Sequence, residues 1–315
     1  MIRRRSFITG LKSTKLSDRE KFFLKNYQPW GVILFSRNIR DFNQVSKLTT
    51  SIRDIFNDKN YPILIDQEGG RVNRLSNLIS VEGFTSEFFG NKYIKDKKEF
   101  RLLFKLFIDK TSHILKILGL NINTVPVLDL NVKGASNIIG NRSFSNNPKI
   151  VSEIGDLCLK IYQENKIGCI IKHIPGHGLS KVDSHHFTPR ISKNKNFLFK
   201  NDFFPFKKKK AFFAMTAHVI FDKIDSKNTA THSKKMIDLI RNKLGFRNLI
   251  ISDDLCMKSL KGSLKEKTVK TFRAGCNLAL HCNGNLKEMR IVGNNSPYIN
   301  KFIIKKTSQF YKILS

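Results

Sequence analysis

The stretch GVILFSRNIRDFNQVSKLTTSIRDIFNDKNYPILID, residues 31–66, contains the repeating unit that decides the fold. It begins with a continuous apolar run at 31–35, which is typical of a strand covered on both faces. The apolar residues that follow are spaced by three or four positions: Val45, Leu48, Ile52 and Ile55. This spacing predicts an amphipathic helix, and residues 62–66 then return to a strand. The segment is therefore predicted to form one β-α-β unit.

The same alternation of strand and helix continues along the chain. Further strands are predicted at 123–128, 169–171, 213–220, 248–252 and 278–282. Helices are predicted from the capping box at 17–20, over 97–118, from Pro148 to about Asn165, after Ser233, after Gly262 and over 298–314. Short apolar strands separated by helices indicate a parallel sheet, either closed as a (β/α)8 barrel or open and doubly wound.

Polar residues follow the apolar strands at five separate places. They are Asp66, Asp129, the Lys172–His173 pair, His218 and the Asp253–Asp254 pair. Strands arranged in a barrel would direct all of these side chains into one pocket, whereas an open sheet would concentrate them at a single switch point. The chain contains neither a GxGxxG string nor a GxxxxGK[ST] loop, so nothing specifically indicates a nucleotide site. We therefore predict an α/β fold with a single (β/α)8 TIM-type barrel over 1–315.

The bulk composition is compatible with one large domain and gives no clear partner. The chain has 315 residues, which can bury a large core, and it has no linker rich in Pro, Gly or Ser. Its net charge of +32 and pI near 10.1 would ordinarily indicate nucleic acid or an anionic membrane. The lysines are spread along the whole chain, however, together with abundant Asn, Ile and Phe. We therefore attribute the charge to compositional drift and predict no specific nucleic-acid partner.

The cysteines and the N-terminus indicate where the protein is found. The five cysteines are odd in number and lack paired metal spacing: Cys158, Cys169, Cys256, Cys276 and Cys282. Free thiols of this kind are typical of a reducing cytosol. The basic first residues lack the apolar segment of a secretory signal, and no later run approaches membrane-spanning length. We predict a cytoplasmic, monomeric protein with no membrane partner.

The segment KHIPGHGLSKVDSHHFTP, residues 172–189, concentrates four histidines, one aspartate and two glycines. Loops of this composition often carry function. Asp183 lies two residues from His185, close enough to hold the tautomer of the imidazole and to stabilise its charged form, as proton transfer requires. Two alternatives are solvated turn histidines and a metal site. The segment has no Glu or Cys, and the chain has no HExxH or CxxC string, so no metal is predicted.

Three further strings stand at predicted strand ends: IDQEGGRVNR at 65–74, GNRSF at 140–144 and ISDDLCM at 251–257. Together with KHIPGHG and DSHH, they resemble glycoside hydrolase family 3. More narrowly, the chain is similar to the bacterial single-domain β-N-acetylglucosaminidases, or β-hexosaminidases, of cell-wall recycling. The likeness covers about 31–282 and includes GVILFSRN, PVLDLN and AMTAHVIF in the same order.

The resemblance implies a role for each matching residue. Asp253 matches the nucleophile that forms a covalent glycosyl-enzyme, His185 matches the acid/base, and Asp183 matches the carboxylate paired with this histidine. The residues implied to hold the hydroxyl and acetamido groups of the first sugar are Asp66, Arg74, Arg142, Lys172 and His173. The resemblance also implies a TIM barrel without a cofactor that removes terminal β-1,4-linked GlcNAc from peptidoglycan (muropeptide) fragments.

Elementary chemistry agrees with these roles. A retaining glycosidase needs an ionised carboxylate nucleophile, and we expect nearby Arg and Lys side chains to keep Asp253 charged. An imidazole titrates near neutrality, so His185 can donate a proton in one step and accept one in the next. Because a neutral imidazole does not repel anions, phosphate could replace water as the acceptor. A β-N-acetylglucosaminide phosphorylase is therefore one alternative, and a catalytically silent basic binding protein is another.

Some of these residues also have plain structural interpretations. Asp253 and Asp254 would suit the beginning of a helix, and Asp254 is expected to cap one. Arg71 and Arg74 would fit the solvated face of a helix. Glu68 is expected to be structural, as its counterpart in the resembling family generally is.

Two positions depart from the pattern of the resembling family. Residues 7–12 lack an acidic strand end, and Asn277 stands where an aspartate is more usual. Neither position touches the nucleophile, the proton donor or the sugar-binding strings. An active enzyme is therefore still predicted.

Overall fold

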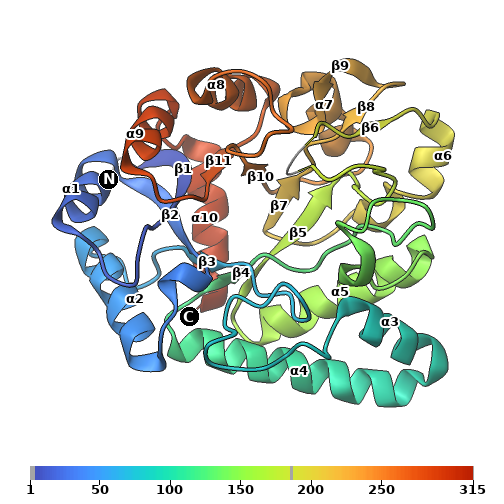
Figure 1. Cartoon of the computed structure of the whole chain (residues 1–315), viewed down its shortest axis with the longest axis horizontal. Coiled ribbons are helices and arrows are strands. Elements are labelled where there is room, and N and C mark those ends of the chain that lie inside the picture. Colours follow the sequence, from blue (N-terminus) through green and yellow to red (C-terminus); the bar gives the residue numbers. More distant parts are fainter. Residues whose placement is uncertain (1–3, 185–186, 315) are drawn as a thin grey trace.

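The structure, a computed structural model, describes residues 4–184 and 187–314. Within them, eight parallel strands form a closed barrel surrounded by helices (Figure 1). Round the barrel, the strands are β1 (Arg5–Gly10), β2 (Pro29–Leu34), β3 (Ile63–Ile65), β4 (Ile122–Asn123), β5 (Gly168–Ile174), β7 (Phe213–Thr216), β10 (Leu249–Asp254) and β11 (Leu278–His281). β11 pairs in parallel with β1 and closes the ring. The predicted TIM-type barrel is confirmed, and the open sheet is excluded.

The helices lie outside the ring of strands. They are α1 (Asp18–Tyr27), α2 (Phe42–Phe56), α3 (Ser86–Lys95), α4 (Lys97–Ile117), α5 (Pro148–Glu164), α6 (Lys195–Lys200), α7 (Lys234–Asn242), α8 (Leu264–Ala274), α9 (Leu286–Asn295) and α10 (Lys301–Leu314). The predicted capping box begins α1, because the Ser17 hydroxyl accepts from the Glu20 N–H and the Glu20 carboxylate accepts from the Ser17 N–H. Helices α3, α6 and α9 lie outside the predicted segments.

Alternating side chains of the strands fill the barrel interior. Those that point inward include Ile8, Ile33, Leu64, Ile122, Ile170, Phe213, Leu249 and Leu278. Helix α10 covers one end of this interior, where Trp30 Nε1 donates to Thr307 Oγ1 at 2.8 Å. The ring of Phe310 packs 5.3 Å from that of Phe213. Since Trp30 and Phe213 stand at the starts of β2 and β7, α10 closes the N-terminal end of the barrel and leaves the C-terminal end for the site.

Two predicted strands differ from the observed ones. The strand predicted at 123–128 is only Ile122–Asn123, followed by a single bridge between Val127 and Lys172. Pro126 within this segment has no N–H to donate to a ladder, which shortens the pairing. The strand predicted at 213–220 is two strands, because β7 ends at Thr216 and the chain then leaves the barrel. It enters a small sheet formed by β6 (Arg190–Ile191), β8 (Ile220–Phe221) and β9 (Asp225–Thr229).

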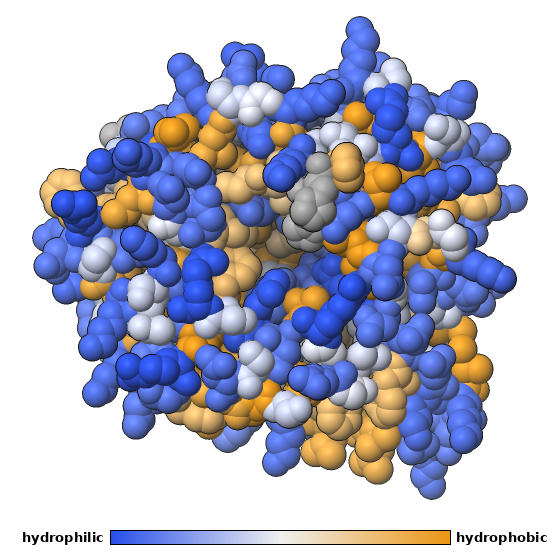
Figure 2. All heavy atoms as spheres, in the orientation of Figure 1, coloured by the Kyte–Doolittle hydropathy of each residue, from blue (hydrophilic) through white to orange (hydrophobic). Residues whose placement is uncertain are grey.

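The surface is largely hydrophilic, and the cysteines are free thiols. Hydrophilic side chains cover most of the face in Figure 2, in keeping with lysines spread along the sequence. Cys158, Cys169 and Cys276 are buried, Cys256 and Cys282 are half-buried, and all five are free thiols. No helix in the described ranges combines the length and the apolar character needed to cross a membrane.

Candidate active site

A pocket of about 220 Å³ opens at the C-terminal ends of the barrel strands. Its polar lining residues are Asp66, Arg74, Thr124, Arg142, Lys172, His173, His177, Ser184, Asp253 and Asp254. Apolar side chains complete the lining, among them Ile33, Phe35, Met215, Met257 and Leu280. Asp66, the Lys172–His173 pair and the Asp253–Asp254 pair therefore meet in one cavity, as predicted for a barrel, whereas Asp129 and His218 contact residues of the lining without lining the pocket themselves.

Asp66, directly after β3, is bound by three side chains. Arg74 NH2 donates to its Oδ2 at 2.8 Å, and Lys172 Nζ and the Thr124 hydroxyl both donate to its Oδ1. Burial would raise the pKa of Asp66, but the charges of Lys172 and Arg74 outweigh it and hold the pKa well below its usual range. Asp66 is therefore a fixed anionic acceptor in the pocket wall.

Glu68 is paired as closely, but it lines a separate small cavity and not this pocket. The Arg142 guanidinium donates to both of its carboxylate oxygens, at 2.7 and 2.8 Å, and Lys172 Nζ lies 2.5 Å from Oε1. Burial would raise the pKa of Glu68, and Arg142 and Lys172 lower it. Its role is to hold these two cations in position, as expected for a structural residue.

The turn after β3 excludes the interpretation that Arg71 and Arg74 lie on the solvated face of a helix. Residues 71–74 form a turn, so Arg71 and Arg74 do not share a helical face. The Arg71 guanidinium donates to the carbonyls of Asn137 and Ile138 at 2.6 and 2.7 Å, and it thereby holds the loop whose Ile138 and Ile139 line the pocket. Arg74 instead turns inward to Asp66.

His173 is oriented by a buried carboxylate. Its Nδ1 lies 2.7 Å from Asp129 Oδ2, and Asp129 also accepts from the backbone N–H of His177 at 2.8 Å. Burial would raise the pKa of Asp129, while His173 lowers it, so Asp129 is the anionic acceptor and the proton sits on Nδ1. The Nε2 atom of His173 is left for the pocket. Burial lowers the pKa of the neighbouring His177 to about 4, so that imidazole is neutral at pH 7.

Asp253, on β10, lines the pocket and forms no ion pair with the described side chains. Its Oδ1 accepts from the N–H of Asp254 at 2.8 Å. Burial raises its pKa, and the imidazoles of His218 and His173 lower it, followed by the Asp254 N–H and Lys172, so that the pKa is below the usual value. The expectation that Arg and Lys would keep Asp253 charged was only partly right, because the histidines have the larger effect.

The prediction that Asp254 caps a helix is wrong. Strand β10 extends to Asp254, and its Oδ1 accepts from the N–H groups of Cys256 and Cys282, each at 3.1 Å. Burial and the adjacent Asp253 raise the pKa of Asp254. The following helix begins only at Leu264, where Ser263 forms a capping box with Glu266.

The predicted acid/base lies outside the described residues. His185 and its neighbour His186 fall there, so the predicted pairing of Asp183 with His185 is not among the described contacts. Ser184 lines the pocket. Asp183 is not among the lining residues, and its charge interacts with that of Arg71.

The other predicted residues meet as expected: Asp66, Arg74, Arg142, Lys172, His173 and Asp253 all line one pocket. The sequence analysis placed Asp129 and His218 at strand ends and His177 in the histidine loop, but it gave none of the three an individual role in the site. His218 Nδ1 lies 2.7 Å from Thr231 Oγ1, and its Nε2 lies 3.0 Å from the Asp254 carbonyl oxygen. The sequence did carry a signal for Asp129, His177 and His218, because each of the three stands at a strand end or in the histidine loop.

Comparison with known proteins shows the family of this chain. The family described as "Glycosyl hydrolase family 3 N terminal domain" matches residues 5–299. A protein of Nitrosomonas eutropha named beta-hexosaminidase is 34% identical over 295 residues, covering 87% of this chain and 79% of that protein. One named beta-hexosaminidase from Actinobacillus pleuropneumoniae serotype 3 is 35% identical over 286 residues, covering 88% and 80%.

Solved structures give the same relationship. NagZ from Neisseria gonorrhoeae in complex with N-trifluoroacetyl-D-glucosamine superposes with a TM-score of 0.84 at 28% identity, covering 98% of this chain and 90% of that chain. The family match at 5–299 spans all eight strands of the barrel. This chain therefore belongs to glycoside hydrolase family 3, among relatives of the β-hexosaminidase type.

Proposed function

We propose that the protein is a retaining exo-β-N-acetylglucosaminidase that removes terminal GlcNAc from β-1,4-linked peptidoglycan (muropeptide) fragments. The observation that carries the proposal is the placement of Asp253, an ionised carboxylate held by one backbone N–H, opposite a wall of charged hydrogen-bonding groups. Membership of the family and the names of the relatives support the hexosaminidase class.

The wall formed by β3 to β5 supports recognition of sugar hydroxyls. Asp66 offers carboxylate oxygens as hydrogen-bond acceptors. Arg74 and Lys172 offer charged donors around the same cavity, and His173 Nε2 offers a further acceptor. Hydrogen bonds with a charged partner are about twice as strong as neutral ones, and these groups are held in place before substrate arrives. The cavity of about 220 Å³ suits one monosaccharide, which favours removal of a terminal residue over cleavage within a chain.

In the first chemical step, Asp253 attacks the anomeric carbon. A bond forms between that carbon and a carboxylate oxygen, and the bond to the leaving oxygen breaks. The Asp254 N–H holds Oδ1, so the other oxygen is available for attack. The leaving oxygen takes a proton from His185, which thereby prevents the departure of an alkoxide.

In the second step, water displaces Asp253 from the anomeric carbon and gives its proton to His185. The carboxylate of Asp183 would stabilise the imidazolium that results. This assignment rests on the DSHH string, and it is supported by Ser184, which lines the pocket immediately before His185. We also propose a cytoplasmic location, which the five free thiols support.

Product analysis in phosphate buffer tests the proposal. With GlcNAc-β-1,4-MurNAc as substrate, we expect GlcNAc to be released first as the β-anomer by proton NMR, because two displacements retain the configuration. Release of GlcNAc-1-phosphate would instead identify a phosphorylase, and initial α-anomer would exclude the covalent route through Asp253. No turnover, together with a salt-sensitive nucleic-acid complex, would favour the silent binding protein.

A further inference from the structure

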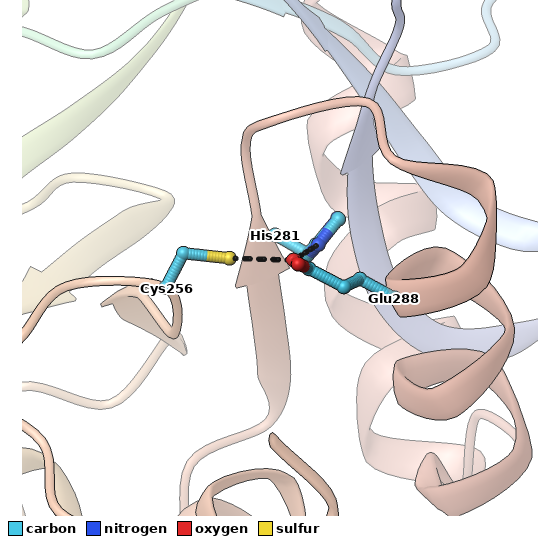
Figure 3. Close-up of side chains that lie close together, drawn as sticks. All are labelled: Cys256, His281 and Glu288. Carbon is cyan, nitrogen blue, oxygen red and sulfur yellow. Dashed lines mark hydrogen bonds and ion pairs between the residues drawn. The ribbon is translucent and has the colours of Figure 1, made fainter. Parts of the chain in front are cut away.

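We propose a second site in this protein, outside the catalytic pocket, that binds a divalent metal ion of the zinc class through Cys256, His281 and Glu288. Figure 3 shows the three side chains converging from a loop, a strand and a helix. This inference does not depend on the proposed hydrolase activity.

The ligand atoms are spaced as a metal would require. Among the described residues, the Cys256 sulfur, an imidazole nitrogen of His281 and a Glu288 oxygen all lie within 4.8 Å of one another. Glu288 Oε2 is 3.4 Å from Cys256 Sγ and 3.1 Å from His281 Nε2. Ligands at zinc bond lengths and a tetrahedral angle would be roughly 3.3–3.6 Å apart, so the two pairs that include Glu288 are already close to the spacing that a bound ion needs.

The contacts of Glu288 support binding of a cation at this cluster. The chain has 57 Lys and Arg against 25 Asp and Glu, so carboxylates have an excess of basic partners available. Among the described side chains, however, Glu288 forms an ion pair only with His281. Its Oε2 instead receives contacts from His281, Cys256 and Asn283 Nδ2. One oxygen thus accepts from three donors, and a metal ion would take the place of the protons on Sγ and Nε2.

The surroundings of His281 also support binding of a metal ion at this cluster. Its side chain is fully buried, and within the described part of the chain its Nδ1 has no hydrogen-bond partner. The imidazole is therefore held through Nε2 alone, the atom that faces Cys256 and Glu288. The Glu288 side chain remains 37% exposed, which leaves a path for an ion to enter.

The cluster is separate from the catalytic pocket, although it lies next to it. Side chains alternate along β11, so Leu280 and Cys282 line the pocket while His281 faces outward toward α9. Glu288 comes from the first turn of α9, and Cys256 from the loop after β10. The Asp254 carboxylate already joins the two loops by accepting from the N–H groups of Cys256 and Cys282. A metal ion would add a second link beside the strand that carries Asp253.

The ligand set selects the class of metal. Thiolate, imidazole and carboxylate together suit Zn²⁺ and its spectroscopic substitute Co²⁺, whereas Mg²⁺ and Ca²⁺ prefer oxygen ligands. Binding would release the Cys256 thiol proton to solvent, since the thiolate is the ligand, and the imidazole proton of His281 would move from Nε2 to Nδ1, since the neutral ring ligates through Nε2. With three protein ligands, water would occupy the fourth position.

Titration of the chelator-treated full chain with Co²⁺ tests the site. We expect one equivalent to produce a thiolate-to-cobalt charge-transfer absorption, which Zn²⁺ then displaces. Cys256→Ser should abolish this absorption, and Glu288→Gln should weaken Co²⁺ binding by roughly 10-fold to 100-fold. Zn²⁺ should raise the melting temperature of the wild type and not of Cys256→Ser.

Cys282→Ser is the matched control, because Cys282 is also half-buried and lines the pocket, where other residues could bind cobalt. This variant should keep the absorption. The proposal is overturned if the wild type gives no thiolate absorption, if Cys256→Ser binds as the wild type does, or if Cys282→Ser loses the absorption instead. Circular dichroism of each metal-free variant must match the wild type, and Glu288→Gln serves if Cys256→Ser does not fold.

Discussion

The two walls of the pocket place acidic side chains in opposite surroundings. On the wall formed by β3 to β5, Asp66 and Glu68 are each paired with cationic side chains. On the wall formed by β10 and β11, Asp253 and Asp254 are surrounded mainly by backbone N–H groups and histidines. Close pairing makes a carboxylate a fixed acceptor and a poor nucleophile, whereas Asp253 keeps an oxygen available. In the proposed mechanism, the same residue type therefore serves binding on one wall and chemistry on the other.

Removing the available carboxylate should have the largest effect. Asp253→Ala should lower kcat on an aryl β-GlcNAc by more than about 10⁴-fold, because no covalent intermediate can form. Steady-state kinetics on purified, correctly folded protein measures this loss. Azide should restore some turnover to the variant and yield the α-glycosyl azide. Substantial activity without azide would contradict the role assigned to Asp253.

Removing the proposed proton donor should have an effect that depends on the substrate. His185→Ala should slow cleavage of a disaccharide by roughly 10²–10⁴-fold, since the leaving oxygen needs a proton. An aryl glycoside with an activated leaving group should lose much less. Equal losses on the two substrates would mean that His185 only supports the structure.

On the wall formed by β3 to β5, removing a buried cation should lower the stability of the folded protein. Lys172→Met leaves both Asp66 and Glu68 buried without their shared cation, which should lower the free energy of unfolding by about 3–5 kcal/mol. Lys209→Met is the control, because Lys209 is equally buried but its partner Asp156 is 60% exposed and can be hydrated. Urea denaturation should show the smaller loss for Lys209→Met. Similar losses in the two variants would contradict the electrostatic account.

A partly exposed cation on the same wall should matter less. Arg74 is 32% exposed and makes one bond to Asp66. Arg74→Gln should reduce kcat/KM by roughly 10-fold, mainly through KM, which corresponds to the loss of about one charged hydrogen bond. Arg74→Lys should recover part of this loss. A fall in kcat with KM unchanged would place Arg74 in the chemical step instead.

The smallest effect should come from a buried carboxylate outside both walls. Burial and the charge of Asp129 raise the pKa of Asp202 well above its usual value. Because the folded pKa is the higher one, the contribution of Asp202 to stability is present below about pH 4 and is lost as the pH rises. Asp202→Asn removes this dependence. The free energy of unfolding of the variant, measured by urea denaturation, should therefore rise relative to that of the wild type between pH 5 and pH 8. A difference between the two proteins that stays constant over this range would contradict the assignment.

The barrel and most of the pocket could be predicted because each signal is local. Asp66, Lys172 and Asp253 all stand at the ends of apolar runs, and the topology of a barrel then brings them together. The length of the strands could not be predicted as well, because β4 is shortened where Pro126 lacks an N–H. The departure at Asn277 is also accommodated, since its Oδ1 accepts from Ile250 N–H at 2.8 Å and from Arg241 at 2.7 Å.

Pairings between distant residues were beyond the sequence. Nothing in the spacing indicates that Arg142 would hold Glu68, 74 residues away. The cluster of Cys256, His281 and Glu288 likewise has no metal-binding spacing, because strand alternation and the first turn of α9 bring it together. The capping assignment for Asp254 failed because acidic residues suit strand ends that receive loop N–H groups as well as helix starts.

The most direct test is to trap the covalent intermediate and locate it by mass spectrometry. A fluorinated GlcNAc glycosyl fluoride should form the glycosyl-enzyme faster than water removes it. After digestion, the added sugar mass should lie on the peptide that contains Asp253, and fragmentation should assign it to Asp253 and not to Asp254. A label on another residue, or slow turnover that gives the α-anomer without any label, would contradict the account.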